Sequence, residues 1–163
     1  MRRVVVNSTP LLVLGNIGQL DILRKMYGKI VIPEAVYREV TEKDDPASQA
    51  ILAAKDWIEV LKIQNTSEYA LYRARLHAGE VETMILAQQE PVADIVVLDD
   101  NAARKTAVFL GLTVTGTIGI LVKAKQNGII QQVKPLLNEI MQNGFFISEK
   151  LLRLILEAAN EQS

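Results

Sequence analysis

Short runs of β-branched and aliphatic residues alternate with helix-like stretches along most of this sequence. One run, Ile95-Val96-Val97-Leu98, is wholly apolar, as is typical of a strand buried on both faces of a parallel sheet. Alternation of this kind predicts an α/β fold in which a mainly parallel sheet is covered by helices. The predicted strands are residues 4–6, 30–32, 58–61, 95–98 and 113–115.

Proline and glycine residues mark the ends of the predicted helices. Pro10, Pro33 and Pro46 each stand where a first helical residue is expected, and Asp45 can cap the third of these helices. Glycines that end a helical stretch and precede an apolar residue are typical of left-handed C-terminal caps. They are Gly28, Gly111, Gly128 and Gly144.

The chain of 163 residues suits one domain spanning residues 1–163, in which residues 116–163 form an all-helical part. The predicted helices of that part are residues 118–126, 133–143 and 149–159, and Ser148 can cap the last one. This last helix is apolar on more than one face. It either packs into its own domain or presents a surface to a second copy or another partner.

Composition excludes several classes of function. There are no cysteines, so disulfides, thiolate metal sites and a cysteine nucleophile are excluded. The formal net charge of −1 gives no global sign of nucleic-acid binding, so any basic surface must be local. No stretch approaches the roughly 20 apolar residues of a membrane span. We expect a cytoplasmic protein that does not associate with a membrane.

Polar and acidic residues follow the predicted strands, and ligands of open parallel sheets bind at that edge. Asn7, Ser8 and Thr9 follow the first strand, Asp99 and Asp100 the fourth, and Gly116 and Thr117 the fifth. The helices add further carboxylates at Glu39, Glu80 and Glu82. Oxygen ligands of this kind suit Mg²⁺ or Mn²⁺, which can promote phosphodiester hydrolysis.

Each of these residues also has a structural interpretation. Asp99 and Asp100 could cap the helix of residues 102–110, and Glu80 and Glu82 would stabilise a helix N-terminus. We expect Ser8 or Thr9 to cap the first helix. Glu39, taken alone, would be a solvated helix residue.

The basic residues are as ambiguous as the acidic ones. Arg104 and Lys105 could meet a substrate phosphate or form a solvated helix face. A stretch ahead of Glu80 combines cations and aromatic rings that could contact RNA. Its members are Tyr69, Tyr72, Arg73, Arg75 and His77. The Gly116-Thr117-Ile118-Gly119 turn could offer backbone N–H groups to a phosphate.

Several segments resemble PIN (PilT N-terminus) domains when taken in order. Residues 4–12 resemble the first strand and helix of that family, which usually read Asp-Thr-Ser or Asn-Thr-Ser before an apolar helix. Residues 30–40, 79–82 and 95–104 resemble its three other acidic segments. Residues 115–121, 124–125, 128–130 and 144–148 are similar to a prokaryotic PIN-like subfamily. The resemblance, which spans about residues 4–159, implies a three-layer α/β/α fold with a central sheet of about five strands.

The resemblance also implies a function and a site. It implies a metal-dependent ribonuclease using Mg²⁺ or Mn²⁺, often the toxin of a toxin–antitoxin pair and commonly a homodimer. The catalytic residues would be Asn7, Glu39, Glu80 and Asp99. The metal ligands would be Glu80, Asp99 and Asp100, with Glu82 as a further candidate for the acidic site. The substrate-binding residues would be Ser8, Thr9, Arg104 and Thr117.

Asn7 departs from the family pattern, because most active PIN nucleases carry Asp there. An amide offers a neutral carbonyl oxygen, so the affinity of the site for Mg²⁺ should fall. A second hypothesis is therefore a weak or inactive PIN-like module that binds RNA or a protein partner. A response-regulator-like switch is a third, but its paired acids normally follow the first strand rather than a late one.

Overall fold

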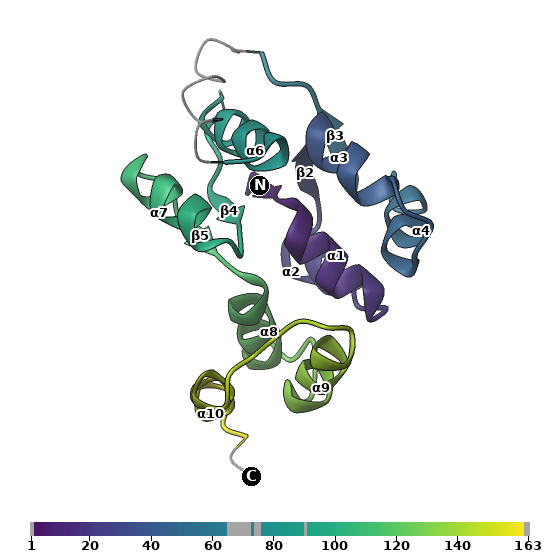
Figure 1. Cartoon of the computed structure of the whole chain (residues 1–163), viewed down its shortest axis with the longest axis vertical. Helices are drawn as coiled ribbons and strands as arrows, with labels where there is room; N and C mark the ends of the chain where they lie inside the picture. Colours follow the sequence, from purple (N-terminus) through teal and green to yellow (C-terminus); the bar gives the residue numbers. More distant parts are fainter. Residues whose placement is uncertain (1, 65–72, 74–75, 90, 162–163) are drawn as a thin grey trace.

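The computed structural model describes residues 2–64, 73, 76–89 and 91–161. Its centre is a five-stranded sheet in the order β3-β2-β1-β4-β5, with all neighbouring strands parallel (Figure 1). The strands are β1 (Val4–Val6), β2 (Ile30–Pro33), β3 (Ile58–Leu61), β4 (Ile95–Val97) and β5 (Val114–Thr115). The predicted parallel sheet is therefore confirmed, with β4 and β5 each one residue shorter than expected.

Helices cover both faces of this sheet, because alternate strand residues point to opposite sides. Val5 packs with the buried residues of α6 (Ala78–Gln88) and α7 (Asn101–Phe109). Val4 and Val6 pack into a second core with the remaining helices. These are α1 (Ser8–Asn16), α2 (Asp21–Tyr27), α3 (Glu34–Thr41), α4 (Pro46–Leu52), α8 (Thr117–Gln126), α9 (Lys134–Gln142) and α10 (Glu149–Ala158). The three-layer prediction is confirmed.

Most of the predicted helix ends are confirmed. Asp45 caps α4 by accepting a 2.8 Å hydrogen bond from the Ser48 N–H, and Pro46 is the first residue of that helix. Ser148 caps α10 through the Leu151 N–H. The four glycines predicted as left-handed caps all have positive φ.

The start of α1 differs from the prediction. Asn7 occupies the N-cap position and makes no side-chain capping bond, so neither Ser8 nor Thr9 caps the helix. The Ser8 hydroxyl instead donates a hydrogen bond to Glu39. Pro10 is the third helical residue rather than the first, and Pro33 is the last residue of β2. Pro10 is tolerated because helices accept proline in the first turn, and Pro33 ends its strand directly before α3 begins.

Helices α1 and α4 approach each other unusually closely at Gly15. A Cβ atom at Gly15 would lie 2.7 Å from Ala47 Cβ and 2.8 Å from Ala47 Cα. The next residue, Asn16, accepts a 3.0 Å hydrogen bond from the Ala47 N–H. The absent side chain and this hydrogen bond together fix how α4 packs on α1.

The C-terminal helices are joined by Glu161. Its carboxylate accepts hydrogen bonds from the N–H groups of Val133 and Lys134, at 2.6 and 3.0 Å, and pairs with Lys125 Nζ at 3.1 Å. The pKa of Glu161 is lowered: burial acts to raise it, but these hydrogen bonds and the Lys125 charge outweigh that effect. Glu161 is thereby held against the start of α9 and against α8.

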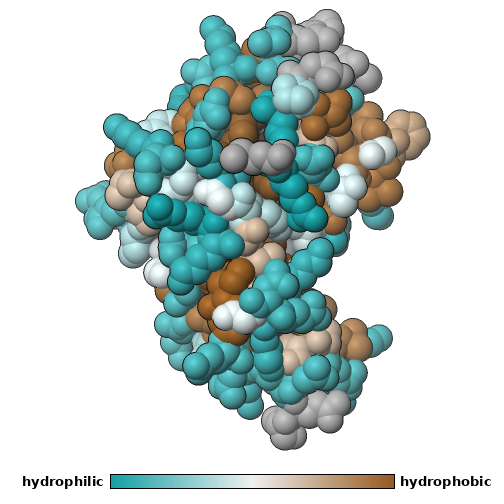
Figure 2. Space-filling model, turned by 180° about the vertical axis from the view of Figure 1, so that it is seen from behind, coloured by the Kyte–Doolittle hydropathy of each residue, from teal (hydrophilic) through white to brown (hydrophobic). Residues whose placement is uncertain are grey.

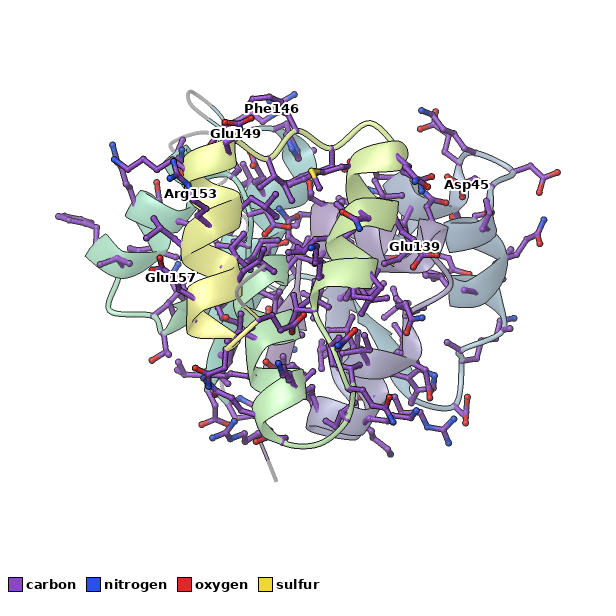
Figure 3. All side chains as sticks on the ribbon, turned by 90° about the horizontal axis from the view of Figure 1, so that it is seen from below. Asp45, Glu139, Phe146, Glu149, Arg153 and Glu157 are labelled. Atoms are coloured by element: carbon purple, nitrogen blue, oxygen red, sulfur yellow. The ribbon has the colours of Figure 1, made fainter. Side chains whose placement is uncertain are left out.

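Helix α10 has both of the features that its sequence left open, namely packing into its own domain and an exposed apolar surface. Ile155 and Leu156 are buried in the core, whereas Leu151 and Leu154 are 44% and 53% exposed. Figure 3 shows charged side chains, including Arg153, along one outer side of α10. The helix therefore packs into its own fold and still exposes apolar residues.

A second exposed apolar area lies on α7. Val108 and Phe109 are 64% and 89% exposed. In Figure 2, seen from behind, hydrophobic surface gathers at the side edge that α7 occupies. Within the described residues, no helix is both long enough and apolar enough to span a membrane.

Candidate active site

The strand order places a topological switch point between β1 and β4. From β1 the chain first adds β2 and β3 on one side of the sheet, and later β4 and β5 on the other. Ligands of such sheets bind in the crevice beyond the carboxyl ends of the strands at this point. The Asn7 N–H continues the β1–β4 ladder with a 3.0 Å hydrogen bond to the Val97 carbonyl. Asn7 and Asp99 therefore follow adjacent strand ends.

Asn7 is buried, with 2% of its surface exposed. Its Oδ1 atom lies 3.2 Å from the Thr83 hydroxyl, which also lies 2.7 Å from the Gly79 carbonyl. A hydroxyl has one proton to donate, and the shorter contact is to Gly79. Thr83 therefore satisfies only part of the hydrogen-bonding capacity of Asn7 Oδ1.

Glu39 is held by the residue that follows Asn7. The buried Ser8 hydroxyl donates a 2.9 Å hydrogen bond to Glu39 Oε1. A Cβ atom at Gly79 would lie 3.1 Å from that same Oε1 atom. Glu39 is an exposed residue of α3, but its Oε1 atom is held by Ser8 of α1 and lies beside Gly79 of α6.

Glu80 is the most buried carboxylate at this edge, with 5% of its surface exposed. Burial raises the pKa of its carboxyl group, the charge and N–H of His77 oppose this rise, and the neighbouring Asp100 carboxyl reinforces it. Glu80 Oε1 accepts a 3.3 Å hydrogen bond from the His77 N–H and lies 3.5 Å from His77 Nε2. Glu80 thus stabilises the start of α6, as its structural interpretation predicted.

Asp100 contacts Glu80 and also caps α7. Its Oδ2 atom accepts a 2.9 Å hydrogen bond from the Ala103 N–H. Its carboxyl also lies close enough to Glu80 to raise the pKa of that residue further. Two ionised carboxylates that lie close together repel each other, and a bound cation would relieve this repulsion.

Asp99 is held by the N-terminus of α8. Its Oδ1 accepts a 2.8 Å hydrogen bond from the Thr117 N–H, and its Oδ2 accepts a 2.6 Å bond from the Thr117 hydroxyl. A Cβ atom at Gly116 would lie 2.9 Å from Asp99 Oδ1 and 2.6 Å from Arg104 Nη1. Asp99 and Arg104 occupy the space that a side chain at position 116 would fill, so glycine suits this position.

Two predicted substrate contacts are engaged within the protein. Both donors of Thr117 go to Asp99, so its backbone N–H is not free for a phosphate. The Arg104 guanidinium donates a 3.1 Å hydrogen bond to the Leu98 carbonyl. We therefore assign both residues to positioning the Asp99 turn. Thr9 is a partly exposed residue of α1, and Lys105 lies exposed on α7.

Glu82, the further candidate for the acidic site, lies elsewhere. Its Oε1 accepts a 3.0 Å hydrogen bond from the Ala35 N–H at the start of α3, and its Oε2 lies 3.9 Å from Arg38 Nη2. Glu82 therefore joins α6 to α3. Of the aromatic and basic stretch, Tyr69, Tyr72 and Arg75 lie outside the described residues, whereas Arg73 and His77 are within them.

The chemistry of these side chains fits a hard divalent cation. Carboxylate and amide oxygens are the ligands that Mg²⁺ and Mn²⁺ prefer. As the side chains stand, no group of at least three His, Asp or Glu residues in the described part of the chain converges on one point. A metal site at this edge would form around Glu80 and Asp100, whose carboxyls lie close together.

The comparisons with known proteins agree with this architecture. Residues 3–161 match the profile of a family described as a PIN domain. No curated protein matches the chain. The match covers nearly the whole sequence, and the five-stranded parallel sheet covered by helices is the fold that the likeness implied. The chain belongs to the PIN-domain family and has its nuclease-like fold.

Proposed function

We propose that this protein is a divalent-metal-dependent ribonuclease that hydrolyses phosphodiester bonds of RNA. The observation that carries the proposal is the contact between Glu80 and Asp100 at the switch point of the sheet. One of these carboxyls is buried with a raised pKa, which is typical of residues at functional sites. Membership of the PIN-domain family supports the same reaction class.

Mg²⁺ or Mn²⁺ would be held by Glu80, Asp99 and Asp100, with the Asn7 amide oxygen as a neutral ligand. When bound, such an ion polarises a phosphoryl oxygen and lowers the pKa of a coordinated water. Asp99 is pre-oriented for this role, because Thr117 fixes both of its oxygens. The fixed carboxylate reduces the reorganisation that binding would otherwise require.

Glu39 would accept a proton from the attacking water. Ser8 donates to one of its oxygens and so fixes the orientation of the carboxylate. The other oxygen, Oε2, remains as an acceptor. General base catalysis of this kind typically contributes about 10²–10⁴-fold to a rate.

The test is cleavage of labelled single-stranded RNA in Mn²⁺, in Mg²⁺ and in EDTA. The wild-type protein and Glu80→Gln are compared with Glu157→Gln, which changes an exposed glutamate on α10 (Figure 3). We expect cleavage only with metal, loss of cleavage in Glu80→Gln, and full activity in Glu157→Gln. Cleavage that persists in EDTA or in Glu80→Gln would refute the metal site.

A second candidate function is a non-catalytic module that binds RNA or a protein partner. Asn7 favours it, since the buried amide supplies one negative charge fewer than Asp would. If the wild type does not cleave RNA under any metal condition and Asn7→Asp does, the site is a degenerate one. The two functions are separated by that single substitution.

We further propose that the protein is a homodimer and the toxin of a pair with a small antitoxin protein, as the family likeness implies. The exposed Val108 and Phe109 on α7 and Leu151 and Leu154 on α10 support an interface with another chain. Sedimentation equilibrium of the purified protein tests the dimer. Growth arrest on expression, relieved by the product of the adjacent reading frame, tests the pairing.

A further inference from the structure

A cationic hollow lies directly beside the proposed catalytic residues. It has a volume of about 370 Å³ and lies between α3 and the start of α6. Two arginines, Arg38 and Arg73, line it together with His77 and the carboxylate of Glu39. Its remaining lining residues are Ala35, Ala78 and Gly79. The net −1 chain thus has a local basic surface at the edge where its function is proposed.

The two arginines are anchored but keep donors free for a ligand. Arg38 Nη2 lies 3.9 Å from Glu82 Oε2, and the Arg38 side chain is 68% exposed. Arg73 Nη1 donates a 3.0 Å hydrogen bond to the Leu76 carbonyl. Because a guanidinium carries five N–H donors, each arginine retains several that can meet an oxyanion. The anchoring contacts limit how much side-chain freedom a ligand must remove.

Gly79 is the boundary between the hollow and the acidic residues. The position of a Cβ atom there is 3.1 Å from Glu39 Oε1, 3.4 Å from Ser8 Oγ and 3.5 Å from His77 Cε1. Glu39 therefore lines the hollow and also belongs to the acidic site. An isolated anion in the hollow would be repelled by these carboxylates. A ligand that suits both the hollow and the acidic site would present one anionic group to the arginines and another to a metal-bound acidic site. Successive phosphates of one nucleic-acid strand do this.

We propose that this hollow holds the phosphate next to the one that is cleaved on a single-stranded RNA, with Arg38 and Arg73 as its direct contacts. The identity of the strand rests on the function proposed above. The guanidinium groups bind the phosphate oxygens, and His77 closes the side of the hollow nearest Glu80. The hollow thereby sets which stretch of the strand enters the site.

The test measures binding rather than cleavage. Fluorescence anisotropy with a short labelled single-stranded RNA is recorded with Ca²⁺ as the divalent cation over a series of salt concentrations, and the RNA is checked to be intact after each titration. For Arg38→Gln/Arg73→Gln we expect the Kd to rise about tenfold and the slope of log K against log salt to fall by about 0.7, as for one lost phosphate contact on a single strand. The matched control is Lys150→Gln/Arg153→Gln, which removes two charges from exposed positions of α10 (Figure 3).

The outcomes separate this proposal from the nuclease proposal. Arginine-dependent binding by a protein that never cleaves RNA refutes the nuclease and supports the hollow. Cleavage with normal Kd and normal salt slope in Arg38→Gln/Arg73→Gln, a variant checked to be folded by circular dichroism, refutes the hollow alone. The proposal for the hollow is also overturned if the wild type does not bind RNA. It is overturned as well if polyglutamate binds more tightly than RNA in an arginine-dependent way. If cleavage occurs, KM should rise in the double variant while kcat stays the same.

Discussion

Thr117 binds both carboxylate oxygens of Asp99, with its N–H 2.8 Å from Oδ1 and its hydroxyl 2.6 Å from Oδ2. The hydroxyl bond is a charge-assisted one in a buried position, since Thr117 is 1% exposed. The first residue of α8 therefore sets the orientation of a residue that follows β4.

Replacing Thr117 with valine removes this hydroxyl while keeping the shape of the side chain. Hydrogen bonds to charged groups contribute about 1.5–3 kcal/mol to folding, so we expect the Tm to fall by roughly 4–8 °C. The kcat for RNA cleavage should fall about tenfold with little change in KM, because Asp99 loses its orientation. Thr117→Ser should restore both values. A valine variant with the wild-type kcat would exclude the positioning role.

Asn7→Asp should change stability in opposite directions with and without metal. A carboxylate at a position that is 2% exposed destabilises the metal-free fold. The same charge should strengthen cation binding, so the rise in Tm on adding Mn²⁺ should exceed that of the wild type. Differential scanning fluorimetry in EDTA and in Mn²⁺ measures both effects. Asn138→Asp, at an exposed position of α9, should show neither.

The raised pKa of Glu80 predicts a pH dependence of stability in EDTA. A carboxyl whose pKa is higher in the folded protein binds its proton more tightly there, so stability falls as the pH rises from the unfolded pKa through the folded one. Glu80→Gln removes this loss. Its Tm in EDTA should therefore exceed that of the wild type at pH 8, and the difference should shrink toward pH 5. A constant difference across this range would contradict the assignment.

The lowered pKa of Glu161 predicts the opposite dependence, in which stability rises with pH. Its folded pKa is lowered, so its ionised form adds stability above the unfolded pKa, and this contribution is lost as the pH falls through the folded pKa. Glu161→Gln should lower the unfolding free energy by about 2 kcal/mol at pH 7, through weaker hydrogen bonds to Val133 and Lys134. Urea unfolding at pH 7 and pH 4 measures the effect, which should be much smaller at the lower pH.

Gly15→Ala tests the close approach of α1 and α4. Alanine improves helix propensity by about 1 kcal/mol over glycine, but overpacking a tight contact costs about 1–3 kcal/mol. The 2.7 Å approach to Ala47 Cβ makes the second effect the larger one, so the variant should be less stable than the wild type. Ala47→Gly in the same chain should recover part of the loss. A more stable Gly15→Ala variant would show that α4 moves freely on α1.

The sheet could be predicted from the sequence because its strands are short, apolar and separated by strong helix signals. Residues 95–98 read as a buried strand, and left-handed glycines such as Gly28 and Gly111 ended helices where expected. The start of α1 could not be placed, since Asn7, Ser8 and Thr9 are all good capping residues in succession. Only the tertiary contact of Ser8 with Glu39 decides between them.

The acidic edge could be located from the strand ends, but the role of each residue could not. Glu80 and Glu82 lie two positions apart on α6, which separates them by about 200° around a helix. Only one of them can face the switch point, and the packing of α6 on the sheet determines that it is Glu80. Thr83 was missed, although it lies three residues after Glu80 and so on a similar face. Arg38 was missed because it acts through contacts between helices.

The strand order also fixes when, during synthesis, this edge can form. Asn7 leaves the ribosome early, but its ladder partner Val97 belongs to β4, which is made much later. Asp99 follows that strand, and Thr117, which orients Asp99, emerges later still. A nascent chain therefore holds an unassembled edge until β4 and the start of α8 have been made. A protein that cuts RNA would in this way become competent only after the codons for these segments had been read.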